Sequence, residues 1–225
     1  MFHATGFLSD AINTFLLVYA GLFPIVNPVG SAPIFLGMTA GVSPQARYVL
    51  ARKVAINGFF LLFGSLLVGS HVLEFFGITV PVVRIGGGLV VTSFGWKMLH
   101  AGEQLDKEHD AQAADEASPT DAFYPLTLPL TVGPGSISVA ITLGSQRPKA
   151  DDLYQLAALG SAATLALLAL SATIFLCYRF AERMVARLGD AGTNVVVRLS
   201  AFILLCIGIQ ILWSGISALL MNAPS

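Results

Sequence analysis

Six stretches of this chain, each about 20 residues long or longer, are apolar and almost free of charged residues. They cover residues 11–37, 54–73, 80–99, 122–145, 153–178 and 199–220. A helix needs about 20 apolar residues to cross a hydrocarbon core roughly 30 Å thick. Only 11% of the residues are charged, against about 25% in soluble domains, so much of the surface must face lipid. The sequence therefore predicts an all-α, polytopic membrane protein with six transmembrane helices.

Basic residues are distributed unequally between the two sides of these spans. The connections after the first, third and fifth spans hold nine of them: Arg47, Arg52, Lys53, Lys97, Lys107, Arg179, Arg183, Arg187 and Arg198. The other side holds three: Arg84, Arg147 and Lys149. Because basic residues gather in cytoplasmic connections, we expect both termini to lie outside the cytoplasm. Aromatic residues near the run ends are expected at the membrane interfaces: Trp96, Trp213, Tyr19, Tyr124 and Tyr178.

A polar stretch divides the chain into two halves of three spans each. Residues 101–121 contain seven of the thirteen acidic residues and one large apolar residue, Leu105. Such a composition is typical of flexible, solvated segments. We therefore expect residues 1–100 and 122–225 to be membrane units joined by an acidic cytoplasmic linker, with a partner-binding segment as the alternative.

The two halves resemble each other in order and spacing. "VNPVGSAPIFL" (26–36) aligns with "VGPGSISVAIT" (132–142), and "VVRIGGGLVV" (82–91) aligns with "VVRLSAFILL" (196–205). Three spans per half is an odd number, so the second half must cross the membrane in the opposite sense. Two inverted three-helix repeats are a recurring architecture of secondary transporters. Chance similarity between apolar segments rich in glycine and proline is the alternative interpretation.

Proline interrupts the first and fourth spans near their centres, at Asn27-Pro28 and Gly133-Pro134. Proline lacks an N–H group and clashes with the carbonyl four residues earlier, and the residue before it is pushed out of the helical region. Gly30, Gly133 and Gly135 are expected to permit the resulting turns. Irregular backbone at this depth is tolerated only where it is buried or lines a cavity. We therefore predict that helices 1 and 4 are broken and meet near the midplane.

Two such breaks offer a binding site for a small zwitterion. The open amides at a helix N-terminus attract a carboxylate, and unwound carbonyls can accept hydrogen bonds from an ammonium group. The residues expected to bind substrate are Asn27, Pro28, Gly30, Ser31, Thr131, Gly133, Pro134, Gly135, Ser136 and Ser138. The plainer interpretation is that the prolines kink two helices and shape only their packing.

Arg84 and Arg198 each lie near the start of an apolar run. They are candidates for a gate or structural latch that bonds to the freed carbonyls; alternatively they snorkel to the interface. The glycines at 86–88 predict close helix packing. No acidic residue lies at a span centre and no GxSxG, HExxH or CxxC motif is present, so we expect no catalytic residue, metal or cofactor. A net charge of −1 gives no basis for binding nucleic acid.

Four motifs together resemble the MarC family of bacterial inner-membrane proteins, named for a locus linked to multiple antibiotic resistance. They are "FPIVNPVGSAPIFL" (23–36), "VRIGGGLVV" (83–91), "PLTLPLTVGPGSIS" (125–138) and "VRLSAFILL" (197–205). The resemblance implies six spans in a bacterial inner membrane, and hence periplasmic termini. It also implies a relationship to a superfamily that exports lysine and other small solutes, and some members look like transporters of glycine and alanine.

The expected function is therefore secondary transport of small neutral amino acids across the lipid bilayer, with Na+ or H+ as the candidate coupling ion. A non-transporting membrane protein of stress response or assembly is the first alternative. Efflux of drugs or metabolites is the weaker one.

Overall fold

The structure is a computed structural model that describes residues 2–100, 121–145 and 153–221. Every regular element in these ranges is helical. The elements are α1 (Phe2–Val26), α2 (Pro28–Met38), α3 (Pro44–Phe75), α4 (Val80–His100), η2 (Ala122–Thr131), α6 (Pro134–Ser145), α7 (Leu153–Arg179) and α8 (Ala181–Met221). The predicted all-α fold class is confirmed. The predicted linker lies outside the described residues except for Asp121, whose side chain accepts a hydrogen bond from the Phe123 amide at 2.8 Å.

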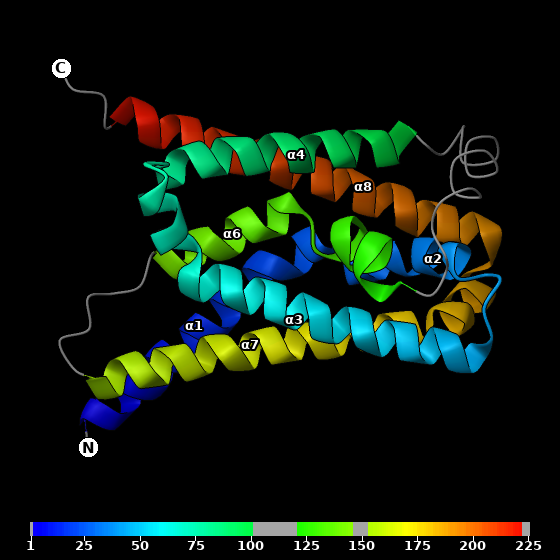
Figure 1. The fold of residues 1–225 in the computed structure, drawn as a ribbon, viewed down its shortest axis with the longest axis horizontal. Coiled ribbons are helices and arrows are strands. Elements are labelled where there is room, and N and C mark those ends of the chain that lie inside the picture. Colours follow the sequence, from blue (N-terminus) through cyan, green and yellow to red (C-terminus); the bar gives the residue numbers. More distant parts are fainter. Residues whose placement is uncertain (1, 101–120, 146–152, 222–225) are drawn as a thin grey trace.

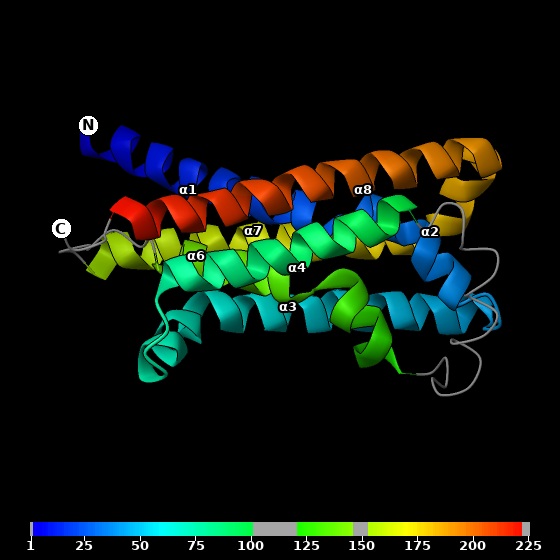
Figure 2. The same cartoon turned by 90° about the horizontal axis from the view of Figure 1, so that it is seen from above.

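The helices run along the long axis of the molecule in alternating directions (Figure 1). The first described residues of α1 and the last of α8 lie at one end, called here the terminal end. The α2–α3 connection and the α7–α8 junction lie at the other, called here the basic end because Arg47, Arg179 and Arg183 gather there. Figure 2 shows α8, α4 and α3 in successive positions across the bundle.

Four spans in the described ranges are long and apolar enough to cross a membrane: Ser9–Met38, Pro44–Phe75, Leu156–Arg179 and Ala191–Met221. The pair η2 and α6 makes a fifth if this bent pair counts as one crossing. Helix α4 is not among them because Arg84, Lys97 and its glycines lower its hydropathy. The prediction of six spans is thus confirmed for four or five.

Two helices are longer than their apolar runs. Helix α3 begins at Pro44, where the Ser43 hydroxyl caps it by accepting from the Ala46 amide at 3.2 Å, although its apolar run begins at residue 54. Helix α8 begins at Ala181 and changes direction at Gly189, which has a φ of 65°. Both helices therefore begin before the apolar runs at 54 and 199, because an apolar run marks the part of a helix inside hydrocarbon and not the polar turns that precede it.

The predicted break in the first span is a discontinuity of one residue. Asn27 adopts the left-handed conformation, with φ 48° and ψ 55°. Hydrogen bonds continue on both sides of it, from the Asn27 amide to the Phe23 carbonyl at 2.9 Å and from the Ser31 amide to the Asn27 carbonyl at 3.0 Å. Helices α1 and α2 consequently continue as one span, Ser9–Met38.

The second break is much larger, because η2 and α6 bend by 70° relative to each other. Within η2, Tyr124 and Leu128 have extended backbone angles, as expected for residues that precede proline. The hydroxyls of Thr127 and Thr131 each donate to a carbonyl five residues earlier, at 2.7 Å. The prolines of η2 lack an N–H group, so the threonine hydroxyls provide hydrogen-bond donors to carbonyls of this widened helix.

The packing of the helices is largely symmetric under exchange of the two halves. Helix α4 packs on α8, and α3 packs on α7. Helix α3 contacts η2 and α6, while α7 contacts α1 and α2; α4 contacts α6, while α8 contacts α2. The main contacts therefore occur in corresponding pairs, whereas the smaller contacts of α8 with α1 and with α7 have no counterpart of similar extent.

Glycines bring α4 and α8 into backbone contact. A Cβ added to Gly88 would lie 2.6 Å from the Leu212 amide nitrogen, and one added to Gly208 would lie 2.5 Å from that of Thr92. The predicted close packing at 86–88 is confirmed for Gly87 and Gly88. A Cβ added to Gly87 would overlap the Ser138 side chain of α6, whereas Gly86 has open space around it.

Candidate functional site

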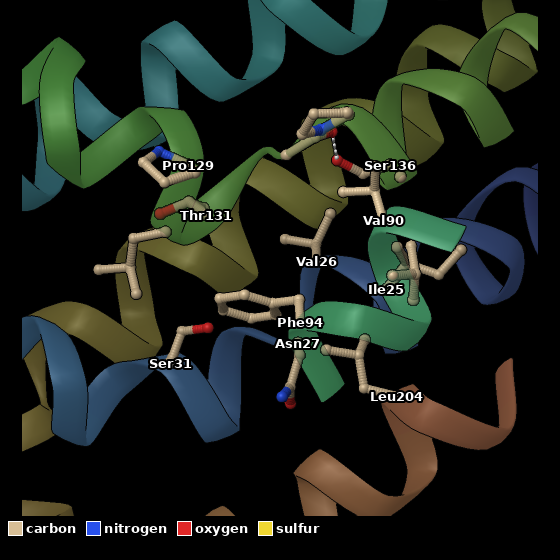
Figure 3. A pocket seen from close by; sticks show the side chains of 15 residues that line it. Ile25, Val26, Asn27, Ser31, Val90, Phe94, Pro129, Thr131, Ser136 and Leu204 are labelled. Atoms are coloured by element: carbon tan, nitrogen blue, oxygen red, sulfur yellow. Dashed lines mark hydrogen bonds between the residues drawn. The ribbon is translucent and has the colours of Figure 1, made fainter. Parts of the chain in front are cut away.

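A cavity of about 80 Å³ lies where the two breaks meet (Figure 3). Its walls come from α1 and α2, from η2 and α6, and from the middles of α4 and α8. The lining residues are Ile25, Val26, Asn27, Ser31, Val90, Val91, Phe94, Pro129, Leu130, Thr131, Gly133, Pro134, Gly135, Ser136 and Leu204. None of them is charged.

The cavity brings together seven of the ten residues expected to bind substrate: Asn27, Ser31, Thr131, Gly133, Pro134, Gly135 and Ser136. Pro28 and Gly30 follow Asn27 but are outside the lining. Ser138 also lies outside it and faces Gly87 on α4. Whether any of these residues binds a solute stays a prediction.

Two of the three glycines expected at turns provide close approach instead. Gly30 and Gly135 lie within α2 and α6, and among the described glycines only Gly77 and Gly189 have a positive φ, so the expectation that these two permit turns is wrong. Gly133 lies in the bend between η2 and α6, as expected. A Cβ on Gly30 would lie 2.5 Å from the Asn27 Nδ2 and 2.7 Å from the Ser200 Oγ. One on Gly135 would overlap Val91 of α4. The backbone of each half-helix is thus held directly against its neighbours.

Asn27 is the polar side chain at the first break. Its Oδ1 accepts a hydrogen bond from the Gly30 amide at 3.2 Å, which caps the N-terminus of α2. Its Nδ2 is buried and has no hydrogen-bond partner within the described ranges. Figure 3 shows the amide group turned toward α8, where Leu204 lies. Buried donors are nearly always paired in native proteins, so an unpaired one at the break is exceptional.

The N-terminus of α6 is the more open of the two helix ends. The Ser136 hydroxyl donates to the Gly133 carbonyl at 2.9 Å, and the Ile137 amide donates to the same carbonyl at 3.1 Å. No hydrogen bond from the described part of the chain reaches the amides of Gly135 and Ser136. At α2, by contrast, the Asn27 side chain accepts from the Gly30 amide, so the α6 end corresponds more closely to the expected open helix end.

The cavity is bordered toward the basic end by a hydrogen-bonded tyrosine. Tyr178 of α7 is completely buried and its hydroxyl lies 2.8 Å from the Thr131 Oγ1; the Ser31 side chain is a second partner. Its ring stacks on Phe35 with a centroid distance of 4.4 Å. The prediction that Tyr178 is interfacial is therefore wrong. It links the polar lining of both halves through α7.

A second group of polar contacts lies beyond this tyrosine, at the basic end. Arg47 of α3 donates to the Thr39 carbonyl at 3.0 Å and to the Thr39 Oγ1 at 3.2 Å, at the C-terminus of α2. It also forms an ion pair with Glu182 of α8 at 3.2 Å. Thr39 is fully buried, so this contact fixes the outer end of α2.

The sequence interpretation missed the apolar wall of the cavity, made by Val90, Val91 and Phe94 of α4 and Leu204 of α8. The alignment of the halves contained a signal for it. Val90 and Leu204 are aligned positions, as are Asn27 and Gly133, and all four line the cavity.

Neither Arg84 nor Arg198 forms a hydrogen bond or ion pair with any described residue. Arg198 is exposed, and Arg84 is partly buried beside Gly215 of α8. The proposed latch to freed carbonyls is therefore absent from this conformation. A gating role for these arginines stays a prediction.

Comparison with known proteins identifies the family. The model described as "MarC family integral membrane protein" matches residues 12–220. A UPF0056 membrane protein of Methanocaldococcus jannaschii is 29% identical over 212 residues, which cover 93% of this chain and 99% of that protein.

Two other relatives match over a shorter segment. A UPF0056 membrane protein of Pyrococcus abyssi is 36% identical over 132 residues, covering 59% of this chain and 64% of that protein. The UPF0056 inner membrane protein MarC of Salmonella typhimurium is 32% identical over 143 residues, covering 61% and 63%. The matches thus span less than two thirds of the length of these two relatives. No solved structure matches the chain. The match over residues 12–220 shows that the chain belongs to the MarC family of integral membrane proteins.

Proposed function

We propose that this protein is a secondary transporter of small zwitterionic solutes, of which glycine and alanine are the best candidates. The substrate binds in the cavity between the α1–α2 break and the η2–α6 break. The protein crosses the membrane six times as two inverted three-helix repeats, and no soluble cofactor takes part.

Unpaired donors around an uncharged cavity carry this proposal. The Asn27 Nδ2 and the amides of Gly135 and Ser136 have no hydrogen-bond partners in the described ranges, and all three residues line the cavity. Leaving a buried donor unpaired costs about 1–3 kcal/mol. A carboxylate, which only accepts hydrogen bonds, satisfies such donors, and a helix N-terminus favours its charge. The hydroxyl oxygens of Ser31 and Thr131 are acceptors for the ammonium group.

The volume of the cavity narrows the choice of substrate. At about 80 Å³ it is well below the roughly 300–1,000 Å³ of sites for drug-sized ligands. Glycine and alanine are the amino acids with the smallest side chains, so the volume favours them over the drug-efflux alternative. A protein that only assists assembly or stress response has no need for unpaired donors at this depth, which argues against that alternative.

The arrangement of helices supports six crossings and an inverted repeat. The main helix contacts occur in corresponding pairs in the two halves, and α2 and α6 run from the middle toward opposite ends (Figure 1). Helix α4 packs closely on α8 through glycines, which suits it to be the remaining crossing. We further propose that the chain lies in an inner membrane, as the Salmonella relative's name says of that protein, with its basic end in the cytoplasm and its termini in the periplasm.

Transport into liposomes tests this proposal. The purified protein is reconstituted and uptake of radiolabelled glycine or alanine is measured with an imposed Na+ gradient, an imposed H+ gradient, or neither. We expect saturable uptake driven by one gradient, inhibited by unlabelled alanine and not by phenylalanine. Absence of uptake under every gradient, by protein that remains folded in the liposomes, would contradict the proposal.

A further inference from the structure

A second cavity, of about 530 Å³, lies between α3 and α7 and is separate from the site at the breaks. It is called here the α3–α7 groove. Its lining is aromatic and aliphatic, with Tyr48, Phe60, Leu168 and Phe175 among the residues, and includes Arg52. Phe60 and Leu168 are 65% and 48% exposed. In a membrane protein such a surface faces acyl chains.

The groove extends from the headgroup region into one leaflet of a bilayer. On α3 it extends from Tyr48, near the basic end, to Phe60. Twelve residues of helix at 1.5 Å each span about 18 Å. Because the apolar run of α3 begins at residue 54, the first two turns of the groove lie at the level of the headgroups. The remaining part, as far as Phe60, extends about 9 Å into the hydrocarbon of one leaflet.

Two cationic side chains stand at the outer end of the groove. Arg52 lines it directly. The Arg179 guanidinium lies 5.2 Å from the ring centroid of Tyr48 and 5.8 Å from that of Phe175, both lining residues. Neither arginine has an acidic partner among the described residues, where the ion pair to Glu182 belongs to Arg47. Two arginines that have no counter-ion in the described ranges are suited to bind a phosphate group at a membrane surface.

We propose that the α3–α7 groove is a binding site for one anionic phospholipid. One acyl chain lies in the groove against α3 and α7, and the phosphate lies between Arg52 and Arg179. The aromatic rings of Tyr48 and Phe175 hold the Arg179 guanidinium over the groove entrance. The apolar lining binds any phospholipid of suitable chain length, and the two arginines select for negative charge.

The test compares two lipids with identical palmitoyl and oleoyl chains. Delipidated protein in detergent is mixed with phosphatidylglycerol or phosphatidylcholine, and native mass spectrometry measures the fraction carrying one lipid. We expect the wild type to retain phosphatidylglycerol roughly tenfold more strongly, since each arginine near an anionic headgroup contributes a few-fold.

Two variants separate the headgroup site from the chain site. The double substitution Arg52→Gln/Arg179→Gln should remove the preference for phosphatidylglycerol while leaving phosphatidylcholine binding unchanged. The matched control is Arg183→Gln/Arg187→Gln, which removes two exposed arginines near the basic end that do not line the groove; it should keep the preference. Ala172→Phe should lower retention of both lipids, because Ala172 is an exposed residue that lines the groove.

Four results would overturn the proposal. Three of them concern retention: equal retention of the two lipids by the wild type, the same loss of preference in the control as in Arg52→Gln/Arg179→Gln, and unchanged retention in Ala172→Phe. Displacement of the lipid by soluble glycerol phosphate would also overturn it, because the acyl chain would then contribute nothing.

Discussion

Replacing Asn27 with glycine separates binding from folding at the first break. Asn27 has left-handed backbone angles, which glycine adopts without a steric penalty. Glycine also stands at the aligned position of the other half, Gly133. The substitution therefore removes the amide group and leaves the backbone conformation allowed.

The effect on stability can be worked out from the contacts of the side chain. Loss of the cap to the Gly30 amide, at 3.2 Å, costs a few tenths of a kcal/mol when glycine replaces the capping residue. The extra flexibility of glycine in the unfolded chain costs about 0.5–1 kcal/mol. Removing the unpaired Nδ2 recovers about 1–3 kcal/mol. The ligand-free variant should thus be as stable as the wild type or up to about 2 kcal/mol more stable.

Binding should change in the opposite direction. If the Nδ2 donates to the substrate, its loss weakens binding by about 1–3 kcal/mol, which is about 5- to 150-fold in Kd. Isothermal titration calorimetry with glycine and alanine measures Kd, and thermal unfolding without ligand measures stability. A variant that binds as the wild type does, or that loses stability with unchanged Kd, would refute this role for Asn27.

Ser138→Ala is the matched control. The Ser138 hydroxyl is also buried without a partner in the described part of the chain, but it lies outside the cavity. Its removal should raise stability by about 1 kcal/mol and leave Kd unchanged. An equal loss of affinity in this control would show that the measurement reports general packing and not contact with substrate.

Further predictions concern helix packing and the contacts of Arg47 at the basic end. Gly95→Ala should destabilise the protein by about 1–3 kcal/mol, because the added Cβ would lie 2.7 Å from a backbone nitrogen of α8. Gly64 has open space around it, so Gly64→Ala should be neutral or slightly stabilising, and thermal unfolding measures the stability of both variants. Arg47→Gln should lower unfolding free energy by about 1–3 kcal/mol because it removes both bonds to the buried Thr39. Glu182→Gln should cost less than about 1 kcal/mol, since its side chain is 72% exposed, and equal effects of the two substitutions would contradict this division.

Each apolar run lies within one helix or one pair of consecutive helices, and four or five of these are long and apolar enough to cross a membrane. The polar turns that extend α3 and α8 beyond their apolar runs could not be predicted from hydropathy. The Ser43-Pro44 pair is nevertheless a typical helix start and could have corrected the start of α3. Nothing comparable precedes the long polar start of α8, which bends at Gly189.

The two breaks could be predicted from proline positions, but not their shapes. Asn27 remains within a nearly continuous span because an asparagine tolerates left-handed angles and caps the next helix itself. At the second break no side chain can do this at Gly133, and η2 with its prolines bends by 70°. The burial of Tyr178 and the apolar wall of α4 and α8 depend on contacts between distant helices, which periodicity does not reveal.

Protection of an introduced cysteine tests most directly whether a small amino acid occupies the cavity. Cys177 and Cys206 are first replaced by alanine, and Ser136→Cys is added in the lining of the cavity. The rate of modification by a small methanethiosulfonate reagent is then measured with and without alanine, alongside Ser43→Cys in the exposed α2–α3 connection. We expect alanine at ten times its Kd to slow modification at position 136 about tenfold by occupancy and to leave position 43 unchanged. Equal rates at position 136 with and without alanine would contradict the central claim that this cavity binds a small zwitterion.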